Sequence, residues 1–346
     1  MNSIIEEDCR NIEKHINLSK LKDKKLLITG ATGFLGSYIA SVVSWANQQK
    51  NLGCTIDCVG FRRPHGIFSD LLPDNRIRYI QKDLSKPFEI KGQYDFIIHA
   101  AGYAQPAKFL ENPFETVTVN VFATRNLLEA ARRSGARFLF FSSAEIYGEI
   151  PQKEMPAKET FNGSCSTLTP RAIYGESKRL GEAICAQYRK DFRIDARIIR
   201  ISHVYGPGLS QNDTRVLSVF IQKALRGKKI ELLDMGNAVK TYGYVADIVT
   251  MIFYVLLHGS DYVYNIGGKD TFSILDVAKK IGSYLHVPVA VPVKNSGLKH
   301  IGKDPQFVKL DLTKICSEMK KFSFTPFDEG LRKTIEWSKS EFAQGL

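Results

Sequence analysis

A glycine-rich turn constrains the fold of this chain more than any other feature. Gly30, Gly33 and Gly36 follow a short apolar run at residues 25–29 with the spacing G-x-x-G-x-x-G, and a helix-like segment comes next. The first glycine of such a turn allows a sharp bend, the second lets the backbone approach a phosphate, and the third lets helix and strand pack closely. The free N–H groups of the helix then point at the phosphates. The pattern predicts a dinucleotide-binding strand–turn–helix unit.

Strand-like and helix-like segments alternate up to residue 200. Short apolar runs predict strands at 55–61, 76–81, 94–101, 137–142 and 197–202, and longer periodic runs predict helices at 37–46 and 116–134. Such alternation favours a parallel sheet with helices on both faces. We therefore predict an α/β fold, a Rossmann doubly wound parallel sheet with a smaller α/β C-terminal substrate lobe.

The pattern loosens beyond residue 200. It predicts helices at 216–225, 245–257 and 273–285 and a strand at 262–266 that returns to the sheet. An amphipathic helix at 3–16 precedes the first strand. We expect an N-terminal helical appendage at 1–21, a dinucleotide-binding domain at 22–200 with a returning segment near 240–268, and a discontinuous substrate-binding lobe at 201–346.

Composition excludes several classes of function. The net charge is +12, from 48 Lys and Arg against 36 Asp and Glu. These basic residues are spread out, which fits small polyanions better than nucleic acid. No apolar run reaches the roughly 18 residues of a membrane span, the first residues lack a secretory pattern, and the six cysteines lack zinc-ligand spacing. We expect a cytoplasmic protein with free thiols and no metal, membrane or nucleic-acid partner.

The end of the second predicted strand bears on the choice of cofactor. NAD enzymes usually place an acid there to hold the ribose hydroxyls, but residues 59–63 contain no acid and end in Arg62 and Arg63. Two arginines favour the 2′-phosphate of NADP, although Arg62 stacked on adenine or left in solvent stays an alternative. Asp83 is placed either to contact the adenine or to cap a turn. The sequence predicts NAD(P) and leaves the choice between NAD and NADP open.

A tyrosine and a lysine supply the candidate chemistry. Tyr174 and Lys178 are four residues apart, so a helix places them on one face. The ammonium is expected to lower the pKa of the tyrosine toward a value useful near neutrality. The serine-rich segment 142–148 lies at the carboxyl end of the fifth predicted strand, where ligands of open parallel sheets bind. A hydroxyl there can hold a substrate oxygen beside Tyr174.

These motifs together resemble the extended short-chain dehydrogenases/reductases, the family of nucleotide-sugar epimerases, dehydratases and decarboxylases. The resemblance covers residues 22–340 and adds the segments His99–Ala101, Asn120 and Arg200–Pro207 to those above. It implies Tyr174 as general base, Lys178 as the residue that tunes it and binds the nicotinamide ribose, and Ser143 as the hydroxyl partner.

The resemblance and the glycine turn assign two sets of binding residues. The candidate cofactor-binding residues, besides Tyr174 and Lys178, are Gly30, Thr32, Gly33, Phe34, Leu35, Gly36, Arg62, Arg63, Asp83, Leu84, Ala100, Ala101, Gly102 and His203. The candidate residues for a nucleotide-diphosphate sugar are Gln105, Lys108, Asn120, Ser143, Ala144, Glu145, Arg215 and Lys240.

Within the family, the triplet Ser143-Ala144-Glu145 is informative. Dehydratases and decarboxylases carry an acid where Glu145 stands, whereas simple epimerases tend to lack one. Ala144 replaces the aspartate that several 4,6-dehydratases use, and residues 105–113 look closer to the decarboxylases. Three departures from the pattern concern the substrate: His203 in place of Asn, Gly208 in place of Arg, and Lys240 in place of an arginine that meets the diphosphate.

The resemblance implies an enzyme that oxidises a sugar 4-hydroxyl with bound NAD(P)+, decarboxylates or dehydrates the product, and returns the hydride. A UDP-glucuronate decarboxylase is favoured over a 4-keto-sugar reductase or a 4-epimerase. A dinucleotide sensor is the non-enzymatic alternative. A homodimer is also expected, paired through helices at 116–134 and 174–188 that carry the apolar residues Leu127, Leu128, Ala131, Leu180 and Ile184.

Overall fold

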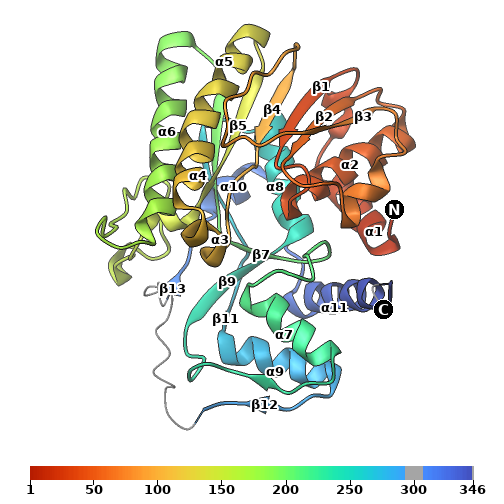
Figure 1. Ribbon diagram of the computed structural model, residues 1–346, viewed down its shortest axis with the longest axis vertical. Coiled ribbons are helices and arrows are strands. Elements are labelled where there is room, and N and C mark those ends of the chain that lie inside the picture. The colour runs from red at the N-terminus through yellow and green to blue at the C-terminus, as the bar shows by residue number, and fades with distance from the viewer. Residues whose placement is uncertain (293–306, 345–346) are drawn as a thin grey trace.

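The computed structural model describes residues 1–292 and 307–344. Its centre is a parallel sheet in the order β10-β6-β5-β4-β1-β2-β3 (Figure 1). The strand order reverses between β1 and β4, as in the predicted doubly wound fold. The strands are β1 Lys25–Thr29, β2 Thr55–Gly60, β3 Ile77–Gln81, β4 Phe96–His99, β5 Arg137–Ser143, β6 Ala196–Ile201 and β10 Val263–Ile266.

Helices cover both faces of this sheet, which is why its strands read as apolar runs. On one face, α1 Ser3–His15, α2 Phe34–Lys50 and α8 Val245–Leu257 contact one another. On the other, α5 Thr124–Ser134 packs against α6 Ala172–Phe192 (Figure 1). The predicted Rossmann fold is confirmed.

The helix predicted at 116–134 is instead three consecutive segments. It comprises α4 Pro113–Val117, a π-helical stretch Thr118–Ala123 and α5. A π-helical stretch inserts an extra residue into the turn and often marks a functional position. Asn120 lies in it, fully buried. A further helix, α3 Pro106–Glu111, precedes α4, and proline stands at the first position of both.

A second, smaller sheet lies beside the central one. It consists of β7 His203–Tyr205, β9 Val239–Tyr244, β11 Asp270–Ser273 and β13 Phe307–Val308, while β8 Ile230–Glu231 pairs with β12 Val289–Ala290. The helices of this part are α7 Val216–Leu225, α9 Ile274–Leu285 and α11 Phe327–Gln344, whereas α10 Thr313–Glu318 contacts β10 of the central sheet. Strand β10 pairs with β6 of the central sheet. Within the described residues, no helix has the length and apolar character that crossing a bilayer requires. The exact domain boundaries stay a prediction.

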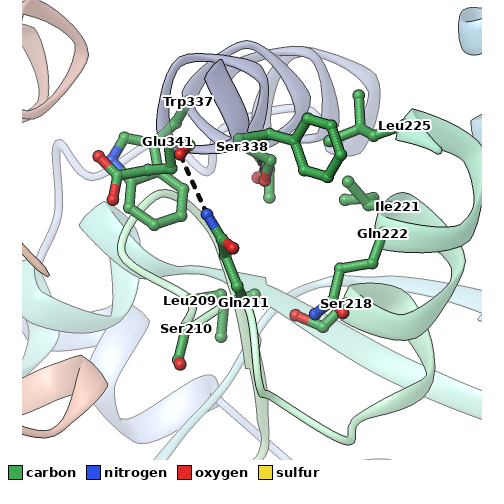
Figure 2. A pocket seen from close by; sticks show the side chains of 12 residues that line it. Leu209, Ser210, Gln211, Ser218, Ile221, Gln222, Leu225, Trp337, Ser338 and Glu341 are labelled. Carbon is green, nitrogen blue, oxygen red and sulfur yellow. Dashed lines mark hydrogen bonds between the residues drawn. The ribbon is translucent and has the colours of Figure 1, made fainter. Parts of the chain in front are cut away.

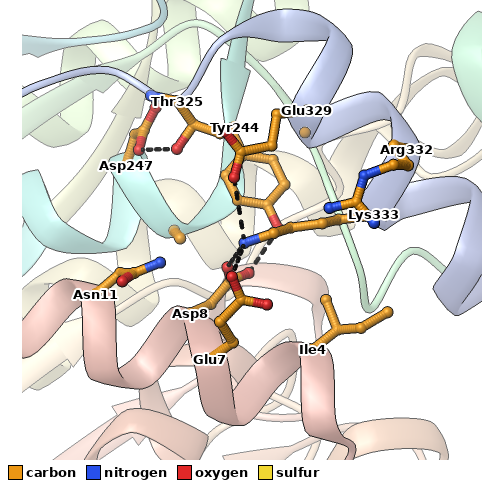
Figure 3. Close-up of polar contacts among 12 residues, drawn as sticks. Ile4, Glu7, Asp8, Asn11, Tyr244, Asp247, Thr325, Glu329, Arg332 and Lys333 are labelled. Carbon is orange, nitrogen blue, oxygen red and sulfur yellow. Dashed lines mark hydrogen bonds and ion pairs between the residues drawn. The ribbon is translucent and has the colours of Figure 1, made fainter.

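The N-terminal helix is fixed to the rest of the molecule by a buried carboxylate (Figure 3). Asp8 accepts hydrogen bonds from Tyr38 Oη at 2.5 Å and from Tyr244 Oη at 2.6 Å. Lys333 Nζ lies 3.2 Å from Asp8 Oδ1 and 3.0 Å from Glu7 Oε1. Burial raises the pKa of Asp8, and the charge of Lys333 opposes that rise. These contacts join α1, α2, β9 and α11.

We expect Asp8→Ala to lower the free energy of unfolding by about 3–5 kcal/mol, because it removes the buried partner of a buried lysine. The two tyrosine hydroxyls lose their acceptor as well. The matched control is Glu6→Ala, which breaks the exposed pair between Glu6 and Arg10 on the same helix and should cost below about 1 kcal/mol. Urea unfolding measures both. Equal small losses for the two variants would contradict the account.

The helices expected to pair two copies present different residues from those predicted. Leu127, Leu128 and Ala131 are fully buried against the sheet, so their part of that prediction is wrong. The apolar periodicity of this helix identifies the face that packs into the core of the single chain, so this face is not free to contact a second copy. Among the residues predicted for pairing, Leu180 is 50% exposed. Two neighbouring aromatic residues are also exposed, Phe114 at 79% and Phe122 at 58%.

Candidate active site

The glycine turn forms a close-fitting cradle at the carboxyl end of β1. Gly30 has a φ of +71°, and a Cβ there would lie 2.7 Å from Ala101 Cα. A Cβ on Gly36 would overlap the carbonyl of Gly30. Gly33 is the N-cap of α2 and makes no side-chain cap, so the first N–H groups of α2 are left for a ligand. This cradle fits the pyrophosphate of a dinucleotide.

A buried histidine holds the strand ends that form the floor of the cradle. His99 Nε2 lies 3.1 Å from Val119 O, and His99 Nδ1 lies 2.8 Å from Thr29 Oγ1. Since a carbonyl only accepts, Nε2 carries the proton and Nδ1 accepts from Thr29. Burial, followed by the charge of Lys178, lowers the pKa of His99 to about 3. A neutral imidazole therefore ties β1, β4 and the π-helical stretch together.

The candidate adenosine side of the cradle lies at the ends of β2 and β3. Strand β2 ends at Gly60, so Arg62 and Arg63 follow it on an exposed loop. Asp83 accepts from Ser85 N at 2.9 Å and Ser85 Oγ at 2.7 Å, which is the turn-capping arrangement. Burial raises the pKa of Tyr103, Asp83 adds to the rise and Arg62 opposes it. Charged side chains that follow both strands therefore act on Tyr103, a residue that the sequence analysis missed.

Tyr174 and Lys178 lie in the first two turns of α6, buried beside the end of β5. The ring of Tyr174 stacks on Phe109 of α3, with centroids 4.8 Å apart and an interplanar angle of 9°. Lys178 Nζ donates to Phe141 O at 2.7 Å and lies 4.9 Å from the centroid of Phe140. The structure thus brings together the tyrosine, the lysine and the strand end, as predicted.

The expected lowering of the tyrosine pKa is wrong. Burial raises the pKa of Tyr174 to about 12, a hydrogen bond with Ser143 opposes the rise, and Glu145 adds to it. Burial also lowers the pKa of Lys178 to about 7. The sequence shows which residues neighbour each other, but the loss of hydration depends on packing that helical spacing does not reveal.

One buried polar atom beside this pair lacks a hydrogen-bond partner within the described residues. Asn120 Nδ2 donates to Ser177 Oγ at 2.9 Å, whereas Asn120 Oδ1 is unpaired. A methyl group on Gly102 would lie 3.4 Å from Asn120 Oδ1 and 3.6 Å from Lys178 Nζ. Buried acceptors are normally satisfied. This one therefore suits a donor from a ligand or water between the two side chains.

The carboxylate of Glu145 is held by an arginine that the sequence analysis missed. Ser143 Oγ accepts from Glu145 N at 3.2 Å. Arg171 Nη2 lies 2.7 Å from Glu145 Oε1, and Arg171 Nε lies 3.3 Å from Glu145 Oε2. Arg171 is the N-cap of α6, one turn before Tyr174. Its position three residues before Tyr174, on the same face of the helix, is the sequence feature that could have identified Arg171 as a site residue.

A loop from the smaller lobe reaches the cofactor cradle. Gln105 Nε2 donates to Asp213 Oδ2 at 3.1 Å, and Thr214 donates to Gln105 Oε1 at 3.0 Å. Arg215 forms an ion pair with Asp213 at 2.6 Å, and its guanidinium lies 5.5 Å from the ring centroid of Phe34. The predicted substrate residues Gln105 and Arg215 therefore share one cluster.

Four other predicted residues lie on different elements. Lys240 is buried on β9 and Ala144 is buried after β5, whereas His203 begins β7. Lys108 lies at the surface, where its ammonium pairs with Glu111 at 2.9 Å. A contact of Lys108 with the substrate stays a prediction.

A small pocket opens elsewhere, between α7 and α11 (Figure 2). It has a volume of about 20 Å³, room for one water molecule. Ser218, Gln222 and Trp337 line it, and Gln211 Nε2 donates to Glu341 O at 3.0 Å across its edge. None of the predicted site residues lines this pocket, so it is separate from the candidate active site.

We expect Lys178→Met to stabilise the unliganded protein at low pH. The ammonium loses its proton near pH 7 when folded, compared with an ordinary pKa of 10.5. Between these values the unfolded state binds more protons, so wild-type stability rises with pH across this window. The stabilisation by Met therefore reaches its full size below pH 7. It amounts to about 1.4 kcal/mol for each pKa unit between the folded and the ordinary value of Lys178, reduced by about 1 kcal/mol for the lost hydrogen bond.

Urea unfolding of both proteins at about pH 6 and about pH 9.5 measures this gain, which should shrink at the higher pH. A difference in stability that is the same at both pH values would show that Lys178 is not desolvated as the structure indicates.

Comparison with known proteins identifies the family. The model of the NAD dependent epimerase/dehydratase family matches residues 26–267. The chain is 31% identical over 324 residues to UDP-glucuronic acid decarboxylase 1 of Xenopus tropicalis, a match that covers 94% of this chain and 74% of that protein. It is 28% identical over 316 residues to UDP-glucuronic acid decarboxylase 1 of Arabidopsis thaliana, covering 91% of this chain and 69% of that protein.

Solved structures share the fold at lower identity. The dTDP-glucose 4,6-dehydratase of Streptomyces venezuelae, solved with NAD, superposes with a TM-score of 0.78 at 22% identity, covering 92% of this chain and 98% of that one. The UDP-glucuronic acid 4-epimerase of Bacillus cereus, solved with UDP-glucuronic acid and NAD, has a TM-score of 0.74 at 23% identity, covering 92% and 99%. The predicted resemblance is confirmed: this chain belongs to the NAD dependent epimerase/dehydratase family.

Proposed function

We propose that this protein is a nucleotide-sugar decarboxylase that converts UDP-glucuronate to a UDP-pentose and carbon dioxide, with no net redox change. The observation that carries the proposal is the arrangement of Ser143, Glu145 and Tyr174 at the carboxyl end of β5, because this set joins a proton acceptor to an additional acid. The match to UDP-glucuronic acid decarboxylases over more than nine-tenths of the chain supports it.

The chain's own residues explain the first half-reaction. Tyr174 takes the proton of the sugar 4-hydroxyl, and Ser143 holds the same oxygen by a hydrogen bond. NAD(P)+ held by the glycine turn would supply the hydride acceptor. Burial raises the pKa of Tyr174 to about 12, so the positive charge of a bound cofactor would favour its loss of a proton. Lys178 and Asn120 would hold the ribose of the cofactor next to Gly102.

The second half of the reaction follows from the chemistry of the ketone. A 4-keto group withdraws electrons from C5, so the bond between C5 and the carboxylate breaks and carbon dioxide leaves. C5 then takes up a proton, whose delivery we assign to Glu145. Tyr174 returns its proton to the 4-oxygen when the hydride comes back to C4. The balance is one carbon dioxide released and one proton taken up.

We assign the diphosphate to Arg215 and Gln105, which share one cluster, and to Lys240. The first two converge beside the cradle, and the third supplies a buried positive charge on β9. Charged groups suit a diphosphate, although a lysine binds it as a point charge rather than as a fork. Arg62 and Arg63 favour the 2′-phosphate of NADP at the adenosine end.

We further propose a homodimer in which Phe114, Phe122 and Leu180 of one copy pack against the same residues of the other. Exposed large apolar side chains on neighbouring helices mark a protein–protein contact, and a self-complementary patch produces a two-fold dimer. Sedimentation should give twice the chain mass of 38.9 kDa. Phe122→Glu should return it to the mass of one chain.

The proposed activity is tested by incubating the purified protein with UDP-glucuronate and NAD+ or NADP+, and analysing the products by mass spectrometry. A decarboxylase yields a UDP-pentose without accumulation of reduced cofactor. Recovery of UDP-glucuronate alone, or of an isomer that keeps its carboxylate, would contradict the proposal.

A further inference from the structure

The geometry points to Arg171 as the residue that recognises the carboxylate of the sugar, with Glu145 occupying that place until the substrate arrives. This inference rests on the proposed function, because it concerns how the same site selects an acidic substrate. It assigns Arg171 a new contact, to the substrate, in addition to the observed pair with Glu145.

The observed pair shows that Arg171 binds a carboxylate in the candidate active site. Two nitrogens of the guanidinium meet both oxygens of Glu145, at 2.7 and 3.3 Å. A fork of this kind matches a planar carboxylate and fixes its orientation. The side chains are 13% and 26% exposed, so the pair is largely shielded but still reachable from solvent.

An aromatic ring links the arginine to the reacting hydroxyl. The guanidinium lies 5.8 Å from the ring centroid of Phe109, and the same ring stacks on Tyr174. Arg171 also caps the helix that carries Tyr174, at the end that favours negative charge. In glucuronate the carboxylate is attached to C5, next to the carbon whose hydroxyl Tyr174 deprotonates. A sugar placed for that proton transfer therefore brings its carboxylate close to Arg171.

Exchange of one carboxylate for another makes the site selective. Arg171 stays paired before and after the exchange, so its own charge is never left buried and unpaired. A sugar with a neutral hydroxymethyl group at C5 offers no such partner, and a site built for a charged group rejects an analogue that lacks it. The exchange also frees the Glu145 carboxylate from its pair, so that it takes up a proton from solvent and delivers this proton to C5.

The test measures binding rather than turnover, in the cofactor-loaded protein with Tyr174→Phe as background so that no ligand is consumed. Calorimetry gives the affinities for UDP-glucuronate and for UDP-glucose, which differ only at C5. The background is compared with the same protein carrying Arg171→Gln, Arg171→Lys or Glu145→Gln.

We expect the background to bind UDP-glucuronate about 10–100-fold more tightly than UDP-glucose, as a charge-assisted hydrogen-bonded contact provides. Arg171→Gln should remove this preference and leave the affinity for UDP-glucose within about threefold, which also shows that the variant is folded. Arg171→Lys should retain part of the preference, because it keeps the charge without the fork. Glu145→Gln should keep or increase the affinity for UDP-glucuronate.

Each contrary outcome has a separate meaning. If the background binds both sugars equally, the acidic substrate of the proposed function is wrong. If the background discriminates and Arg171→Gln discriminates as well, the proposed function survives and the inference is overturned. If Glu145→Gln loses the preference as Arg171→Gln does, Arg171 acts only through Glu145, and the direct contact is overturned.

Discussion

Tyr174→Phe is expected to lower kcat by about 10²–10⁴-fold, the usual contribution of a positioned proton-transfer group. The ring remains, so its stacking on Phe109 should persist. Only the hydroxyl and its hydrogen bond with Ser143 are lost. Cofactor affinity and the thermal midpoint should therefore stay close to those of wild type. Product formation, cofactor titration and thermal melting measure these three properties.

A matched control for this variant lies on the same helix. Tyr188→Phe removes a hydroxyl that donates to Glu129 at 2.6 Å, on a part of α6 distant from the cradle, and should leave kcat unchanged. If Tyr174→Phe behaved like Tyr188→Phe in every assay, the proton transfer assigned to Tyr174 would be wrong. The dinucleotide-sensor interpretation would then be favoured, because a sensor requires no proton-transfer group.

Gly30→Ala is expected to abolish measurable cofactor binding, a loss of at least about 100-fold. A methyl group at this position would lie 2.7 Å from the backbone of Ala101. Contact at that distance forces β1 and β4 apart at the point where the pyrophosphate must approach the backbone. The variant should also unfold at a lower denaturant concentration, because overpacking costs about 1–3 kcal/mol in addition to the backbone strain.

Gly227 provides a control that isolates the steric part of this effect. Its φ of +68° is close to the +71° of Gly30, yet a Cβ on it would meet nothing within 4 Å. Gly227→Ala therefore carries the same backbone strain, about 1 kcal/mol, without the clash. Calorimetric titration with NAD+ and NADP+ should show wild-type affinity for Gly227→Ala. Equal losses of cofactor affinity in the two variants would contradict the assignment of the glycine turn as the pyrophosphate-binding site.

Sequence patterns predicted the features that depend on interactions between residues close together in the chain. The turn at Gly30, Gly33 and Gly36 followed from glycine spacing, and the central strands followed from apolar runs, because strands buried on both faces tolerate few polar residues. The pairing of Tyr174 with Lys178 followed from helical periodicity. These features depend on residues only a few positions apart, so the printed sequence contains them.

The features that were missed depend on contacts between distant segments. Arg171 contacts Glu145 because α6 starts near the end of β5. His99 of β4 forms a hydrogen bond with the backbone of the π-helical stretch. The high pKa of Tyr174 reflects burial under α3, which no spacing reveals. Helix α11 was not predicted either, although its buried Lys333 anchors the N-terminal helix.

The most direct test of the central claim uses UDP-glucuronate with deuterium at C4. The account predicts a UDP-pentose that keeps the deuterium at C4, with one carbon dioxide released per molecule, because the hydride leaves C4 and returns to it within one turnover. Nuclear magnetic resonance and mass spectrometry of the product detect both. Deuterium collected in reduced cofactor, or a labelled product that still carries its carboxylate, would contradict a decarboxylase that recycles its cofactor.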